Sequence, residues 1–150
     1  MPKIAYLYRG LSHNLIIYSI HKELTMYRNL NINPLHRRTE DCTVRAIATV
    51  LDRPWEEVYT DLCREGLRFY DMPSANHVWG SYLKKKGFRR HIIPDNCPQC
   101  YTVRDFARDN PEGHFILALH GHVVPIVEGD WIDTWNSGDG IPIYYWEKGD

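Results

Sequence analysis

The chain has 150 residues, of which 43% are hydrophobic and 13% aromatic, a composition that suits one globular domain with a substantial buried core. Lysine and arginine total 18 against 19 aspartates and glutamates, so the formal net charge is -1. A chain with so little net charge has no overall field that would attract nucleic acid or anionic lipid. We therefore expect no nucleic acid and no membrane among its partners.

The hydropathy and the cysteine content of the sequence bear on the cellular compartment in which the protein is expected. No segment approaches the roughly 18 consecutive apolar residues of a membrane span, and the short apolar run at residues 15–20 is followed by charged side chains rather than by a signal cleavage site. We therefore predict a cytoplasmic protein whose cysteines stay reduced and remain available for catalysis, metal binding or packing. These cysteines are Cys42, Cys63, Cys97 and Cys100.

The first 30 residues show only weak periodicity, with one short alternating stretch at residues 4–8 and an apolar run at 15–18. We interpret residues 1–30 as an N-terminal extension or an added strand, and residues 31–150 as a single domain.

The first clear helix follows this extension. Its N-cap is Thr39 or Asp41, it stops before Pro54, and Cys42 lies in its first turn. Its apolar side chains recur at helical spacing, at Val44, Ile47, Ala48 and Leu51. A second helix is predicted from Pro54 to near Gly66, and a third from residue 74 to the three lysines at 84–86.

The second half of the chain predicts mainly strands. A short strand at 88–93 and a short helix after Thr102 come first. Runs of β-branched and aromatic residues separated by glycine-containing turns then predict an antiparallel meander, at residues 114–119, 122–127, 131–135 and 141–146. Helices followed by strands indicate an α+β domain.

Cys42 is the first candidate for chemistry. The free N–H groups and aligned peptide dipoles of a helix N-terminus favour a thiolate. The negative charge of the neighbouring Asp41 opposes this effect, so activation would require a histidine partner. Without such a partner, a packing role is the simpler interpretation of a free cysteine.

His122 and Asp133 supply that partner. His122 opens one predicted strand and Asp133 lies on the next, across the turn at residues 128–130. Antiparallel neighbours place such side chains close together, and a carboxylate can then hold the imidazole in one tautomer. A thiol delivered by a helix that packs on this sheet would complete a set of nucleophile, base and orienting group.

Three segments resemble the papain-like cysteine peptidases, especially their short bacterial and phage members. They are Asp41-Cys42 at a helix start, Gly121-His122-Val123-Val124 at a strand start, and Asp133-Thr134-Trp135 on the next strand. The resemblance covers residues 31–146. It implies a nucleophile helix packed on a C-terminal antiparallel sheet, with Cys42 as nucleophile, His122 as general base and acid, and Asp133 as its orienting group.

One feature of that family is missing. His36 stands six residues before Cys42, where the family usually has the glutamine that stabilises the oxyanion. The backbone N–H of Cys42 would supply one donor, and Asn33, His36 or a nearby arginine the other. We favour Asn33, whose amide can donate as glutamine does, although an Asn-Pro turn explains the residue equally well.

Other side chains leave alternatives open. Asn136 would orient His122 in place of Asp133 if the strand register slipped. Cys97-Pro98-Gln99-Cys100 has the spacing of half a zinc site, yet no second such pair is present and a plain turn is the simpler interpretation.

The preferred function is a cysteine-dependent hydrolase, a peptidase or isopeptidase that acts through an acyl-thioester and needs no cofactor. Its partner would be a peptide or protein substrate. A catalytically inactive papain-like module that binds protein and an acyltransferase with the same triad are the alternatives.

Overall fold

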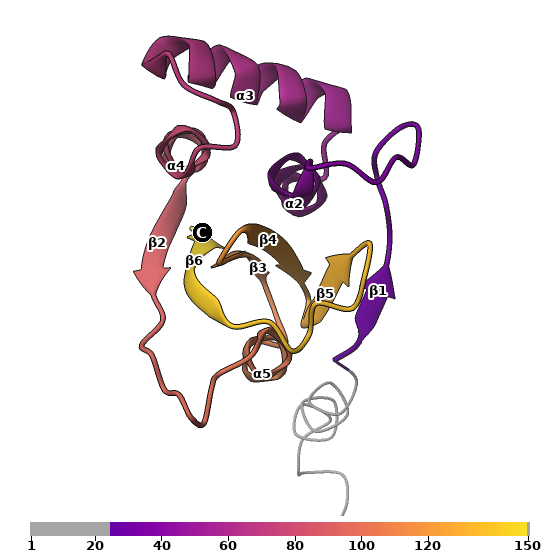
Figure 1. The fold of residues 1–150 in the computed structure, drawn as a ribbon, viewed down its shortest axis with the longest axis vertical. Helices are drawn as coiled ribbons and strands as arrows, with labels where there is room; N and C mark the ends of the chain where they lie inside the picture. Colours follow the sequence, from indigo (N-terminus) through magenta and orange to yellow (C-terminus); the bar gives the residue numbers. More distant parts are fainter. Residues whose placement is uncertain (1–24, 150) are drawn as a thin grey trace, which may run out of the picture.

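The computed structural model describes residues 25–149, which form a six-stranded sheet with helices on both faces (Figure 1). In their order across the sheet, the strands are β1 (Tyr27–Asn29), β5 (Asp130–Asp133), β4 (His122–Val127), β3 (His114–Leu119), β6 (Pro142–Lys148) and β2 (Phe88–Ile92). The helices are α2 (Cys42–Leu51), α3 (Trp55–Phe69), α4 (Asn76–Lys85) and α5 (Val103–Asp109). The predicted α+β class is confirmed.

The sheet separates two hydrophobic cores. Helices α2, α3 and α4 lie on one face and α5 on the other (Figure 1). Alternate side chains of β3 serve both cores, since Ile116 and Ala118 pack under α2–α4 while Phe115 and Leu117 pack against α5. The strand is therefore apolar along its whole buried length, which explains its continuous hydrophobic run in the sequence.

The order of the strands differs from the predicted meander at one point. Strands β3, β4 and β5 do form successive antiparallel pairs, but β6 returns to pair with β3 instead of β5. The free edge of β5 is taken by β1, which runs parallel to it. Because that edge is occupied, the 134–141 connection carries β6 to the opposite edge of the hairpin, where β2 then pairs with β6.

Two helix boundaries also differ from the predictions. Helix α3 continues past Gly66 to Phe69, and α4 begins at Asn76 instead of residue 74. Gly66 lies inside the helix, and the loop that follows passes close to it. A Cβ at this position would stand 2.6 Å from the carbonyl oxygen of Asp71 in that loop. This glycine permits a close approach of the chain and does not end the helix.

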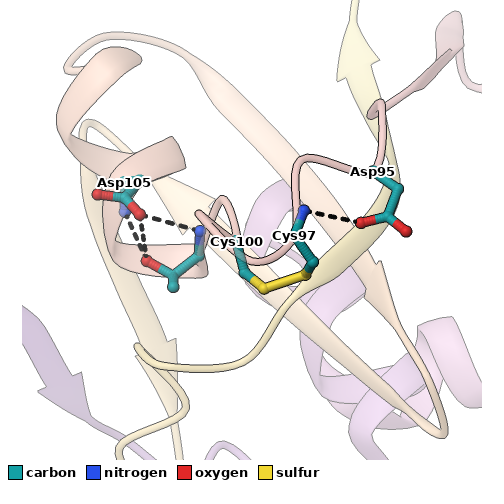
Figure 2. The surroundings of a disulfide bond; sticks show 5 residues. Asp95, Cys97, Cys100 and Asp105 are labelled. Atoms are coloured by element: carbon teal, nitrogen blue, oxygen red, sulfur yellow. Dashed lines mark hydrogen bonds between the residues drawn. A yellow bond between two sulfur atoms is a disulfide. The ribbon is translucent and has the colours of Figure 1, made fainter.

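The loop before α5 contains a disulfide between Cys97 and Cys100, which Figure 2 shows together with the start of the helix. The expectation that all four cysteines stay reduced is therefore wrong for this pair. Both sulfurs are bonded to each other, so they are not available as zinc ligands. Thr102 caps α5 as predicted, in a capping box with Asp105.

At its N-terminal end, the described chain contributes β1, a short edge strand within the segment that we interpreted as an extension or added strand. The alternating stretch at 4–8 and the apolar run at 15–18 lie outside the described residues. Within residues 25–149, none of the helices combines the length and the apolar character that crossing a membrane requires.

Candidate active site

Cys42 is the first residue of α2 and lies half-buried in a cleft of about 820 Å³ that also contains His122. The helix forms because its apolar stripe packs on β4, with Ile47 and Ala48 in the core between them. This packing brings the N-terminal end of α2 to the start of β4. The sequence prediction that a helix delivers the thiol to the sheet is confirmed.

His122 and Asp133 are joined by a short hydrogen bond. The Nε2 of His122 lies 2.6 Å from Oδ2 of Asp133, and the Asp133 side chain is only 1% exposed. The register of β4 and β5, continued past their last paired residues, places His122 opposite Trp135 and Asp133 on the neighbouring diagonal. Diagonal partners on adjacent strands lie within reach of long side chains, which explains the contact.

This contact fixes the tautomer of the histidine. Because the ionised carboxylate of Asp133 only accepts hydrogen bonds, Nε2 of His122 is the donor. The other ring nitrogen, Nδ1, is left for the side chain of Cys42, which lines the same cleft and whose pKa is lowered by His122. The three predicted residues are therefore brought together in the order thiol, imidazole and carboxylate.

Electrostatics favour a charged thiol and imidazole. Burial acts to raise the pKa of Cys42, but the hydrogen bond and charge of His122 outweigh it and lower that pKa. Burial acts to lower the pKa of His122, but hydrogen bonds with Asp133 and Cys42 raise it to about 9. The pKa of Asp133 is lowered, because its bond to His122 offsets the effect of burial. These directions favour the charged forms of both groups, a thiolate beside an imidazolium.

Trp135 covers the histidine from the solvent side. Its ring centroid lies 5.2 Å from that of His122, and the residue is 53% exposed. Trp131 and Trp146 are instead buried in the sheet cores. The indole of Trp135 thus lies beside the ring of His122, whose side chain is 16% exposed.

Asp41 is the N-cap residue of α2, one of the two residues predicted for that position, but its side chain does not cap the helix. Oδ1 accepts from Nε of Arg45 at 2.8 Å, and Oδ2 accepts from Nδ2 of Asn33 and Nε1 of Trp55, each at 3.0 Å. The charge beside the nucleophile is therefore held by three donors in the interior.

The structure does not bring the predicted oxyanion donor to the thiol. The amide of Asn33 donates to Asp41, its oxygen accepts from the backbone of Leu35, and the residue does not line the cleft of Cys42. It belongs to the turn that we considered as its alternative role. His36 is likewise engaged with the carbonyl oxygen of Asn31.

Asn136 does not replace Asp133. Its side-chain oxygen accepts from Nε1 of Trp131 and from the backbone of Gly138, which fixes the turn after β5. The residue that contacts His122 is Asp133. Ser137, from the same turn, is fully buried beside that carboxylate.

Arg45 is the site residue that the sequence analysis missed. It lies within α2, is 8% exposed, and places Nη1 3.3 Å from Oδ1 of Asp133 while Nε contacts Asp41. Its position in the sequence was the available signal. Arg45 stands between the apolar residues Val44 and Ala46 of a predicted helix, and it follows Asp41 by four residues, the spacing of an ion pair on a helix.

The cleft continues into a second, more apolar pocket of about 590 Å³. Thr39, Glu40 and Ser74 line both spaces, so the two are adjacent. Exposed apolar side chains line the second pocket, among them Leu35, Tyr59 and Met72.

Metal ligation offers no comparable site in the described part of the chain. Within residues 25–149, no group of three or more histidine, cysteine or acidic side chains is arranged to hold an ion.

The comparisons with known proteins assign no function to this site. Family models, curated protein sequences and solved structures were all searched, and none matches this chain.

Proposed function

We propose that this chain is a papain-like cysteine hydrolase that cleaves a peptide or isopeptide bond. The observation that carries the proposal is that Cys42 and His122 line one open cleft, with a 2.6 Å bond between His122 and the buried Asp133 behind it. A free cysteine that only packed in the core would not need an oriented histidine partner. The chain order of nucleophile helix, histidine strand and carboxylate strand also agrees with the family that the sequence resembles.

The proposed reaction has two steps. In the first, the thiolate of Cys42 attacks the carbonyl carbon, the C–N bond breaks, and the imidazolium of His122 gives its Nδ1 proton to the leaving amine. In the second, His122 takes a proton from water, whose oxygen attacks the thioester. A carboxylic acid is released, and the thiolate of Cys42 and the imidazolium of His122 are restored. Asp133 remains ionised throughout and keeps the imidazole in the required tautomer.

The shape of the cleft supports an extended peptide as substrate. Charged side chains from the loop before α2, Arg37, Arg38 and Glu40, line the catalytic cleft, while the adjoining pocket is lined by apolar ones. A peptide could place polar backbone in the first space and an apolar side chain in the second. The backbone N–H of Cys42 is the proposed oxyanion donor, since the first turn of a helix leaves such groups unpaired.

A peptide pool with known sequences tests this proposal. After incubation, mass spectrometry should detect new peptide termini with the wild-type protein and none with Cys42→Ser. Acid quenching during turnover should also trap a peptide fragment on Cys42, because the acyl-thioester is an obligatory intermediate. Binding of peptides without new termini or a trapped adduct would favour the inactive protein-binding module instead.

A further inference from the structure

Arg45 links the catalytic carboxylate to the residue beside the nucleophile. Its guanidinium contacts Asp133 through Nη1 at 3.3 Å and Asp41 through Nε at 2.8 Å. All three side chains are at most 10% exposed. A charge so well removed from water is retained only when its partners are fixed and hydrogen-bonded, because desolvating it is costly.

The two carboxylate oxygens of Asp133 accept hydrogen bonds from different donors. Oδ2 accepts from His122, whereas Oδ1 accepts from Arg45 and from the backbone N–H of Thr134 at 2.8 Å. With Oδ1 held by two donors, the carboxylate cannot rotate without losing both bonds. Arg45 and the Thr134 amide therefore determine which way Asp133 presents Oδ2 to the histidine.

The Nε side of the Arg45 guanidinium is also held in place, by Asp41. Asp41 accepts its Nε on one oxygen, and the second oxygen is held by Asn33 and Trp55. The planar guanidinium is thus oriented from both sides, a task that suits its rigid array of donors. Its positive charge also lies between two carboxylates, of which Asp41 directly precedes Cys42 in the chain.

We propose that Arg45 is a positioning residue for the triad: it orients Asp133 toward His122 and offsets the charge of Asp41 beside the thiolate. The inference rests on the proposed function, since it assigns Arg45 a task in activating Cys42. It also explains how a nucleophile can follow an aspartate directly. Among its causes, the lowered pKa of Cys42 includes the charge of Arg45, although burial and His122 have larger effects.

The test is the rate of Cys42 alkylation by iodoacetamide between pH 5 and pH 10. Removing Arg45 alone would leave two buried carboxylates without their cation, so the main variant is Asp41→Asn/Arg45→Met, compared with Asp41→Asn. We expect the double variant to remain folded but to require a higher pH for the same rate. Near pH 7 its rate should fall about tenfold, which corresponds to about one pKa unit.

Two further variants separate positioning from stability. Arg45→Lys keeps the charge without the planar fork, so its pH profile should lie between those of the wild type and the double variant. Arg53→Met removes an arginine that pairs with Glu57 and Asp61 away from the triad. It should lower the melting temperature and leave the pH profile of Cys42 unchanged.

Superimposable profiles for the folded double variant and Asp41→Asn would overturn the inference, because Arg45 would then contribute only to stability. Failure of the proposed function has a different signature: Cys42 of the wild-type protein would then be alkylated no faster than Cys42 of His122→Ala. Including His122→Ala in the same measurements therefore distinguishes the two outcomes.

Discussion

At the scale of single residues, His122 depends on its two neighbours for its protonation state. Burial alone would favour the neutral ring, yet the bonds to Asp133 and Cys42 raise the pKa of His122 to about 9. The imidazolium is therefore retained at neutral pH and lost as the pH rises through about 9. Below that pH it can donate a proton to a leaving amine, so activity should decline on the alkaline side.

Replacing Asp133 tests this dependence. In Asp133→Asn the ionised acceptor is lost, so the pKa of His122 should fall from about 9 toward its ordinary value of about 6.5. An NMR titration of the ring carbon resonances measures the change, and Asn136→Ala is the matched control because Asn136 does not contact His122. An unchanged titration in Asp133→Asn would show that this carboxylate does not govern the histidine.

The site was predictable from sequence as far as its chemistry follows local patterns. A cysteine at a helix start and a histidine and aspartate on successive strands are visible in the chain, and the structure brings all three together. The donors around Asp41 were not predictable, because Asn33 and Trp55 reach it from outside α2. The sequence analysis predicts that the charge of Asp41 opposes the thiolate, because the i,i+4 spacing to Arg45 does not by itself show that the two side chains are buried together.

At the scale of elements, the end of α3 shapes the pocket beside the cleft of Cys42 and His122. The loop after α3 approaches Gly66 closely and is tied to it by a hydrogen bond from the amide of Asp71 at 3.0 Å. This loop continues into Met72 and Pro73, which line the apolar pocket, and Ser74, which lines both spaces. Gly66 thus allows the loop that lines these two spaces to pass close to helix α3.

Gly66→Ala should therefore destabilise the protein. The added Cβ would stand 2.6 Å from a backbone oxygen. Overpacking of this kind destabilises a protein by about 1–3 kcal/mol, whereas the higher helix propensity of alanine stabilises it by about 1 kcal/mol. We expect a net loss of about 1 kcal/mol in the free energy of unfolding, measured by urea denaturation. Thr60→Ala on the exposed side of α3 is the control, and an equal or higher stability of Gly66→Ala would contradict this account.

The elements themselves were largely predictable because they follow simple periodicities. The runs of β-branched and aromatic residues in β3 to β5 and the capping residue Thr102 gave the correct type of structure at the correct place. The position of β6 was not predictable from these patterns. It depends on β1 occupying the edge of β5, a long-range pairing that leaves no local mark in the sequence.

At the scale of the whole molecule, the sheet separates helix α2 from the disulfide. Cys42 lies at the start of α2 on one face, whereas Cys97 and Cys100 precede α5, which packs on the other face (Figure 1). The two features should therefore be independent. A bridge over a sequence separation of 3 closes only a very short loop, so its stabilising effect in the unfolded chain is limited.

Replacing both bridged cysteines tests this independence. Cys97→Ser/Cys100→Ser should lower the free energy of unfolding by about 2 kcal/mol, the value that chain entropy gives for so short a loop. The alkylation rate of Cys42 in the folded variant should equal that of the wild type. Thermal denaturation and thiol labelling measure the two quantities, and a slower reaction at Cys42 would show that the faces are coupled.

The central claim is that His122 activates Cys42, and competitive thiol labelling tests it most directly. Cys63, the other free cysteine of the described chain, is also half-buried and serves as the internal reference. At pH 7, limiting iodoacetamide should label Cys42 at least about tenfold faster than Cys63 in the wild type, and this preference should disappear in His122→Ala. Equal labelling in the wild type, or a preference for Cys42 that survives His122→Ala, would contradict the account.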